Sequence, residues 1–220
     1  MNRLRIGIVG NGPDALLPEL SKYKEEIDLW IGADRGAFTL INSGLPLDYA
    51  LGDFDSVNKV ELEQIRDNAT QFKTFPEEKD ETDIELALEQ AFLLEPETII
   101  MFGVTGGRKD HELINIQLLY SIVKHGMKGI IIDKDNYLQL TLPGRHHLNN
   151  DNDYSSISFI PFTEEVRGLT LDGFYYPLEN ERISWGSTRC ISNKLSAKSG
   201  TYSYEQGILL LIKSRDSIPI

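Results

Sequence analysis

Two aspartates, Asp53 and Asp55, follow a short apolar segment and lie one residue apart. In an extended chain, side chains two positions apart leave the same face, so both carboxylates can converge on one point. They repel each other there unless a cation lies between them. Mg²⁺ takes one or two carboxylates and completes its shell with water and phosphate oxygens, so the pair indicates a magnesium site beside phosphates. The alternative is that both aspartates only stabilise a turn.

A second group of acids precedes the helix expected from about residue 83. Its members are Glu77, Glu78, Asp80, Glu81 and Asp83. Thr82 and Glu85 match a capping box, and acids in a first turn complement the helix dipole. A cap needs only one acid, however, and crowded acids are costly unless they are solvated or some of them face a cation. Both interpretations stay open at this point.

A glycine pair, Gly106 and Gly107, follows an apolar segment and precedes Arg108, Asp110 and His111. Paired glycines let a backbone approach a phosphate, an arginine can bridge phosphate oxygens, and a helix amino terminus adds partial positive charge. The alternative is an ordinary glycine turn with Asp110 as the helix N-cap. For His111, a surface position, a ligand contact and a proton-transfer role all stay open.

An earlier glycine turn matches the dinucleotide pattern G-x-G-x-x-A through Gly10, Gly12 and Ala15, with Asp34 at about the expected distance. That pattern is weakly specific, and a phosphate held on helix-terminal N–H groups is the favoured interpretation. Asp34 follows an apolar segment, and acids at the carboxyl ends of parallel strands lie where open α/β sheets bind ligands. Asp34 could equally cap a helix.

The elements that must position these residues alternate over the first 134 residues. Strands are expected at 5–9, 29–33, 48–51, the segment ending at 75, 98–104 and 129–133, and helices after Pro13 and at 38–41, 58–66, 84–92 and 110–124. This alternation predicts an N-terminal α/β domain, residues 1–134, with a mainly parallel sheet. The helix at 110–124 is apolar on most sides, which predicts a central position.

The pattern changes after residue 134, where helical periodicity gives way to short alternating segments. These lie at 137–142, 156–162, 168–174, 182–185 and 207–213, separated by Gly, Pro, Asn and Asp. Such spacing predicts a C-terminal all-β sandwich domain, residues 135–220. His146 and His147 are adjacent, so on a strand they would face opposite ways, and we expect both at the surface.

Composition limits the classes of function. The chain of 220 residues has 34 acidic and 22 basic residues, a formal charge of −12, which argues against a nucleic-acid surface but not against a nucleotide bound with a divalent cation. A single cysteine, Cys190, excludes an intrachain disulfide and fits a reducing compartment. The sequence shows neither a signal peptide nor a stretch of membrane-spanning length, so we expect a soluble, cytoplasmic protein with no membrane partner.

Taken together, the ordered motifs resemble those of thiamine pyrophosphokinases, most of all the short bacterial form, over nearly the whole chain. The motifs are Asp34-Arg35-Gly36-Ala37, Gly52-Asp53-Phe54-Asp55-Ser56, Asp80-Glu81-Thr82-Asp83, Gly106-Gly107-Arg108-Lys109-Asp110-His111 and Ser192-Asn193. The resemblance implies that thiamine and ATP become thiamine diphosphate and AMP, with Mg²⁺. It also implies that the α/β domain holds ATP and the metal, that the β-sandwich contributes to the vitamin site, and that the active sites of a homodimer lie between subunits.

The resemblance also carries residue roles over by position. The metal-binding acids would be Asp53, Asp55, Asp80 and Asp83. The ATP and phosphate site would comprise Asn11, Asp34, Thr82, Gly106, Gly107, Arg108, Asp110 and His111. The thiamine contacts would be Ser187, Ser192 and Asn193. For catalysis, an alcohol attacks the β-phosphorus in line, Arg108 offsets charge on the triphosphate, and Asp55 or Asp83 accepts the hydroxyl proton.

One position departs from the family pattern. Family members commonly carry an aromatic residue two positions after the asparagine of the serine-rich segment, where this chain has Leu195. A ring stacked on the vitamin would contribute about 1–3 kcal/mol. Either Leu195 replaces the ring with apolar contact or another ring serves, and Trp185, Tyr202 and Tyr204 are the candidates for that ring.

Two rival functions remain to be weighed. A dinucleotide-dependent oxidoreductase would use Gly10, Gly12 and Asp34, but would leave the other acids without a task. A non-catalytic module that senses a nucleotide or vitamin would bind these ligands without turnover. Neither rival uses the full set of motifs.

Overall fold

The computed structural model describes residues 4–215. The chain divides into two compact units, Met1–Lys134 and Asp135–Ile220, and each is described by itself below. Within the described residues, no helix is both long enough and apolar enough to cross a membrane.

The first unit is built on a parallel sheet whose strands are hydrogen-bonded in the order β4-β3-β2-β1-β5-β6. The strands are β1 (Arg5–Val9), β2 (Leu29–Ala33), β3 (Tyr49–Gly52), β4 (Gln71–Thr74), β5 (Thr98–Phe102) and β6 (Lys128–Ile132). The central strands are buried on both faces, as parallel strands covered by helices must be. Ile6, Ile8 and Ile99 are each 0% exposed. The predicted α/β domain with a mainly parallel sheet is confirmed.

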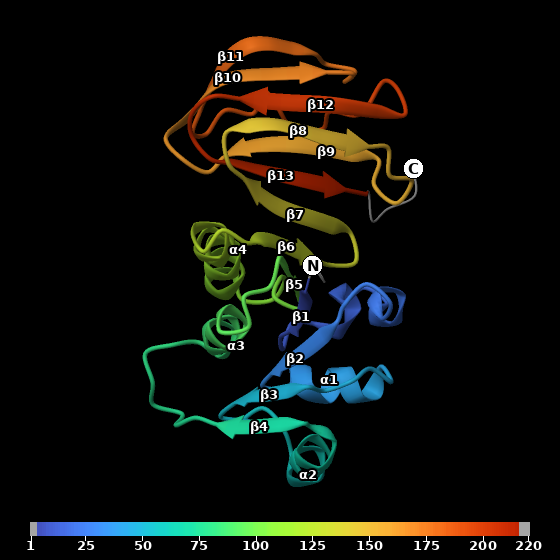
Figure 1. Ribbon diagram of the computed structural model, residues 1–220, viewed down its shortest axis with the longest axis vertical. Coiled ribbons are helices and arrows are strands. Elements are labelled where there is room, and N and C mark those ends of the chain that lie inside the picture. Colours follow the sequence, from blue (N-terminus) through green and yellow to red (C-terminus); the bar gives the residue numbers. More distant parts are fainter. Residues whose placement is uncertain (1–3, 216–220) are drawn as a thin grey trace. The chain divides into compact units, whose positions relative to one another are not determined.

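Helices cover both faces of this sheet. They are α1 (Gly36–Asn42), α2 (Lys59–Asn68), α3 (Asp83–Phe92) and α4 (Lys109–Lys124). Figure 1 shows α1 on one side of the sheet and α3 with α4 on the other. The helix expected after the first strand is replaced by two short 3₁₀ turns, η1 (Asp14–Leu16) and η2 (Leu20–Tyr23).

The prediction that the helix at 110–124, which is α4 in the structure, is central was wrong. Leu119 and Ile122 of α4 are buried, but Leu113 is 60% exposed, Ile114 43% and Tyr120 42%. Helix α4 packs against β6 and α3. The sequence shows which sides of a helix are apolar, whereas burial depends on which elements the fold places beside those sides.

The second unit is antiparallel throughout. Its strands are β7 (Asn136–Thr141), β8 (Gly144–Asn149), β9 (Ser156–Pro161), β10 (Glu165–Asp172), β11 (Leu178–Ser184), β12 (Ser199–Tyr204) and β13 (Leu209–Ser214). One group pairs in the order β7-β13-β9 and the other in the order β11-β10-β12-β8. A common core includes Phe159, Leu169 and Tyr202, so the predicted sandwich-like domain is confirmed.

Two strands of this unit escaped sequence analysis. Strand β12 alternates buried Gly200, Tyr202 and Tyr204 with partly buried serines and a threonine, which gives it a weak apolar signal. Strand β8 carries the adjacent histidines. His147 is exposed as expected, but His146 is only partly exposed because its ring stacks on Tyr202 at 4.7 Å.

Candidate functional site

A cavity of about 670 Å³ opens in the first unit where β1, β2 and β5 end. Strand β1 has β2 on one side and β5 on the other, so the connections that follow β1 and β5 leave in opposite directions. Such a switch point leaves a crevice at the carboxyl ends of the strands, where open α/β sheets bind ligands. Asn11, Asp34, Asp83, Arg108 and Asn115 are among the residues that line this cavity.

Gly10 and Gly12 have a packing role at this crevice. The amide N of Gly12 donates to the carbonyl of Gly103 at 2.7 Å, which ties the loop after β1 to the loop after β5. A Cβ at Gly12 would lie 2.6 Å from that carbonyl oxygen, and a Cβ at Gly10 would lie 2.9 Å from it. The two glycines are therefore explained by close loop packing, without a dinucleotide.

Asp34 follows β2 and is buried, with 6% of its surface exposed. Its Oδ2 accepts hydrogen bonds from Ser56 Oγ at 2.5 Å and Asn11 Nδ2 at 3.5 Å, whereas Oδ1 is buried with no hydrogen-bond partner. Burial raises the pKa of Asp34, and the Ser56 hydrogen bond opposes that rise. The backbone of Asp34 itself adopts the left-handed conformation, with φ 51°. An unpaired carboxylate oxygen in this setting is costly for folding, which is typical of a functional site.

A hydrogen-bonded chain anchors the loop that carries Ser56. Arg35 donates to Ser56 O at 3.2 Å and makes two bonds to Glu61, at 3.0 and 3.1 Å. Glu61 in turn completes a capping box with Asn58 at the start of α2. The start of α1 and the start of α2 therefore hold the 53–56 loop in place beside Asp34.

Asp53 and Asp55 lie on the turn after β3, and not on the extended segment from which their convergence was expected. Between them, Phe54 adopts φ 60°, is 4% exposed and stacks on Phe72 with ring centroids 5.0 Å apart. With that ring anchored in the core, both neighbouring carboxylates point toward Asp34. One carboxylate oxygen each from Asp34, Asp53 and Asp55 lies within 4.8 Å of the other two.

Asp83, the first residue of α3, approaches this group through Lys79. Lys79 Nζ lies 2.9 Å from Asp53 Oδ2 and 3.1 Å from Asp83 Oδ1. Burial raises the pKa of Asp83, with Lys79 opposing. Burial would also raise the pKa of Asp53, but the hydrogen bonds from Lys79 and the Asp55 amide outweigh it and lower that pKa. Asp80 is exposed on the preceding loop, outside the group of three acids.

The donor set fits a hard divalent cation. Carboxylate oxygens are the ligands that Mg²⁺ prefers. Asp34 Oδ1 is buried without a hydrogen bond, whereas Asp83 Oδ1 is buried with Lys79 Nζ 3.1 Å away as its neighbouring cation. The buried Asp34 oxygen therefore retains the lone pairs that a cation needs.

The glycine pair ends the loop before α4. Gly106 (φ 85°) and Gly107 (φ 72°) both adopt positive φ angles, which favour glycine. The Gly106 amide donates to Glu112 Oε2 at 3.0 Å. Arg108, and not Asp110, is the N-cap residue of α4. Arg108 makes two hydrogen bonds to Asp110, at 3.1 and 2.6 Å. These bonds are the main cause that lowers the pKa of Asp110 to about 2, and the His111 amide adds to it.

Most of the remaining predicted residues of the first unit line the same cavity, whereas Asp53, Asp55 and Asp80 are not among its lining residues. Thr82 is the N-cap of α3 and accepts from the Glu85 amide at 3.3 Å. Thr82 and His111 are exposed and line the cavity, as do Asn11 and Gly107. Every predicted nucleotide-site residue except Asp110 is in the cavity wall, and Asp110 is paired with Arg108.

Sequence analysis missed two residues at this site. Asn115, 7% exposed on α4, donates from Nδ2 to the Val104 carbonyl at 2.8 Å. Its signal was an amide on the otherwise apolar side of a helix. Lys79 was passed over among the five acids around it, although a lone lysine in an acidic segment is the obvious internal cation.

In the second unit, the three predicted thiamine residues lie on the segment between β11 and β12. Asn193 is 3% exposed, and its side chain is fully engaged with backbone. Oδ1 accepts from the Tyr176 and Lys194 amides at 3.0 and 2.9 Å, and Nδ2 donates to Tyr176 O at 2.8 Å. Ser187 is partly exposed and its Oγ accepts from the Arg189 amide at 3.3 Å, whereas Ser192 is exposed. Asn193 therefore positions this segment.

The candidates for a stacking ring differ in accessibility. Tyr202 and Tyr204 are 2% and 3% exposed, and Tyr204 donates its hydroxyl to the Thr141 carbonyl at 2.5 Å. Leu195 packs against the core of the unit. Trp185, by contrast, is 67% exposed and is free to contact a ligand.

Comparison with known proteins agrees with this two-unit architecture. A family model described as "Thiamin pyrophosphokinase, catalytic domain" matches residues 20–131, and one described as "Thiamin pyrophosphokinase, vitamin B1 binding domain" matches residues 145–209. Thiamine pyrophosphokinase of Bacillus subtilis is 47% identical over 211 residues, which are 96% of this chain and 99% of that protein.

Solved structures give the same result. The crystal structure of thiamine pyrophosphokinase from Bacillus subtilis matches with a TM-score of 0.91 and 46% identity, over 96% of this chain and 99% of that one. The crystal structure of the Geobacillus thermodenitrificans protein with the same name matches with a TM-score of 0.89 and 42% identity, over 99% and 100%.

Fold and comparisons together define the class of protein, an α/β transferase with an acidic cavity at its switch point and a separate β unit. The chain belongs to the thiamine pyrophosphokinase family, whose members are diphosphokinases.

Proposed function

We propose that this protein transfers the pyrophosphoryl group of ATP to the hydroxyl of thiamine, giving thiamine diphosphate and AMP, with Mg²⁺ as the metal. The observation that carries the proposal is the buried, unpaired carboxylate oxygen of Asp34 beside Asp53 and Asp55 at the switch point of the sheet. Family membership supplies the reaction, and the acidic cavity supplies a site suited to it.

The proposed metal ligands are the four acids Asp53, Asp55, Asp80 and Asp83, with Asp34 as an additional carboxylate. Mg²⁺ bound there would neutralise charge on the triphosphate. The supporting observations are the short separations among Asp34, Asp53 and Asp55 and the buried Asp34 Oδ1 that lacks a hydrogen bond.

The triphosphate would lie along the same cavity wall. Arg108 has 73% of its side chain exposed, and its ion pair with Asp110 is exposed as well, so little energy holds it away from a ligand. Gly107 and the amino terminus of α4 offer backbone N–H groups and partial positive charge to phosphate oxygens. Asn11, Thr82 and His111 would add polar contacts around the nucleotide.

The chemical step needs positioning and little covalent help. The hydroxyl oxygen of thiamine forms a bond to the β-phosphorus of ATP while the bond from that phosphorus to the α–β bridging oxygen breaks and AMP leaves. Asp83 or Asp55 takes the hydroxyl proton.

The second unit would hold the vitamin through Ser187 and Ser192, with Asn193 fixing their segment and Trp185 stacking on a ring of the substrate. The exposure of Trp185 supports this choice over Tyr202 and Tyr204. A homodimer with active sites between subunits, and a cytoplasmic location, complete the proposal. Light scattering of the purified protein tests the dimer.

The direct test mixes the purified protein with ATP, Mg²⁺ and thiamine and separates the products by chromatography. We expect thiamine diphosphate and AMP in equal amounts. Replacing Asp55 by Asn should lower turnover by orders of magnitude, whereas Asp67→Asn, an exposed site on α2, should leave it unchanged. ADP as the nucleotide product, or ligand binding without turnover, would refute the proposal.

A further inference from the structure

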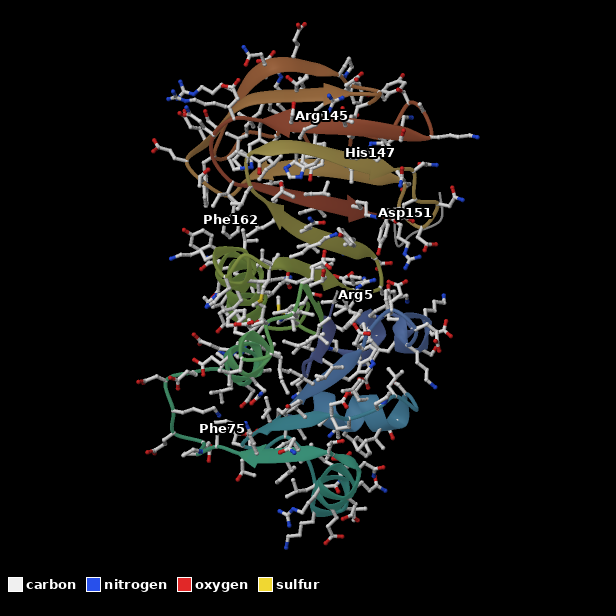
Figure 2. The ribbon with its side chains drawn as sticks, in the orientation of Figure 1. Arg5, Phe75, Arg145, His147, Asp151 and Phe162 are labelled. Atoms are coloured by element: carbon white, nitrogen blue, oxygen red, sulfur yellow. The ribbon has the colours of Figure 1, made fainter. Side chains whose placement is uncertain are left out.

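The side chain of Lys79 is largely shielded from solvent, in an acidic loop whose other charged residues are exposed. The loop leaves β4 near Phe75, swings outward and returns at α3, as Figures 1 and 2 show. Only 11% of the Lys79 side chain is exposed, whereas Glu77, Glu78 and Asp80 beside it are all exposed. The chain therefore turns this lysine inward, away from solvent.

The ammonium of Lys79 occupies the space between acids from different elements. It makes both of the ion pairs recorded among residues 4–215 for Asp53 and Asp83. The partly buried carboxylates have side-chain exposures of 14% and 27%. A cation at this place offsets the mutual repulsion of the acids that would otherwise open the cluster. Lys79 is thus doing, within the chain, what a divalent cation would do for the same oxygens.

We propose that Lys79 is an internal counter-ion that competes with the divalent cation for Asp53 and Asp83. It holds the two carboxylates together in the nucleotide-free protein, and it leaves them when the cation binds. Lys79 lies in the wall of the same cavity, so its displaced ammonium can pair with a phosphate of the nucleotide. This inference rests on the metal site of the proposed function.

The consequence is coupling between metal and nucleotide. Before nucleotide binds, the cation must displace an ammonium, and its affinity is lowered accordingly. Once a triphosphate is present, the ammonium has a new partner and the competition weakens. The cation therefore binds most tightly with nucleotide, by the reciprocity of linked binding.

The test measures metal affinity directly, by calorimetry with Mg²⁺ and by electron paramagnetic resonance with Mn²⁺. In the absence of nucleotide, Lys79→Gln should bind the metal at least about tenfold more tightly than the natural protein, since one neighbouring charge shifts a carboxylate's affinity for a cation by roughly 10- to 10³-fold. Lys79→Arg keeps the charge and should stay near the natural affinity. Lys73→Gln removes the same charge from exposed β4 and should change nothing.

Two further measurements do not depend on turnover. A non-hydrolysable ATP analogue should raise the metal affinity of the natural protein more than that of Lys79→Gln. With the metal chelated, Lys79→Gln should melt at a lower temperature, and adding Asp53→Asn to it should restore part of the loss because the repulsion is removed.

The outcomes separate the two ideas. An unchanged or weaker metal affinity in Lys79→Gln, with the metal still lost on Asp55→Asn, overturns the counter-ion and leaves the proposed metal site standing. An absence of metal binding in both the natural protein and Lys79→Gln overturns both. A metal-free melting temperature that Lys79→Gln leaves unchanged also counts against the counter-ion.

Discussion

Replacing Asp34 by Asn should make the protein more stable and less active at once. The ionised carboxylate of Asp34 is disfavoured by burial, and its Oδ1 has no hydrogen bond. Asn keeps an oxygen that can accept from Ser56, carries no charge, and tolerates the left-handed backbone at φ 51° better than most residues do. Relieving an active-site cost of this kind commonly stabilises by about 0.5–2 kcal/mol.

For a chain of this length, 1 kcal/mol corresponds to a change of about 2–4 °C in the melting temperature, so the metal-free Asp34→Asn protein should melt roughly 1–8 °C higher. Metal affinity and turnover should both fall. The assay pairs thermal unfolding in chelator with calorimetric Mg²⁺ titration. Ser56→Ala is the control, because losing the donor to Asp34 should lower stability without changing the charge of the site. An Asp34→Asn protein that melts lower than the natural one, or that turns over normally, would refute the reasoning.

Two further predictions concern the second unit. Lys213 lies 2.5 Å from Asp151, and although burial opposes it, this pairing lowers the pKa of Asp151 below its usual 3.8. The stabilisation is therefore present above pH 3.8 and is lost as the pH falls through the lowered pKa. Asp151→Asn should accordingly lower the melting temperature at pH 7 and have little effect near pH 2, with the exposed Asp153→Asn as control. Trp185→Leu should weaken thiamine binding by about 1–3 kcal/mol. It should also abolish the quenching of tryptophan fluorescence by thiamine, because the other tryptophan, Trp30, is only 1% exposed. Unaltered quenching would exclude Trp185 from the site.

Much of the fold could be read from local patterns. Strands buried on both faces are continuous apolar segments, so β1, β2 and β5 were expected close to where they lie. The pattern was weaker for β8 and β12, whose outward residues are polar and whose inward ones include a glycine. For α4, composition predicted a buried helix, but burial requires neighbours on every side, and sequence periodicity carries no information about neighbours.

The candidate site divides in the same way. Asp53 and Asp55 were expected to converge by the two-residue spacing of an extended chain. They do approach each other, but through a turn in which Phe54 has φ 60°. The dinucleotide interpretation of Gly10 and Gly12 could be removed only when Gly103, some ninety positions away, was found against them.

By itself, the sequence determined the class of fold, the family and the set of acids at the ends of strands, because these depend on residue types and their order. Only the tertiary structure decided that Asp34 is buried with an unpaired oxygen and that Lys79 turns inward between Asp53 and Asp83. Electrostatic interactions depend on distances of a few ångströms between atoms. For residues 26 positions apart, such as Asp53 and Lys79, folding alone sets those distances.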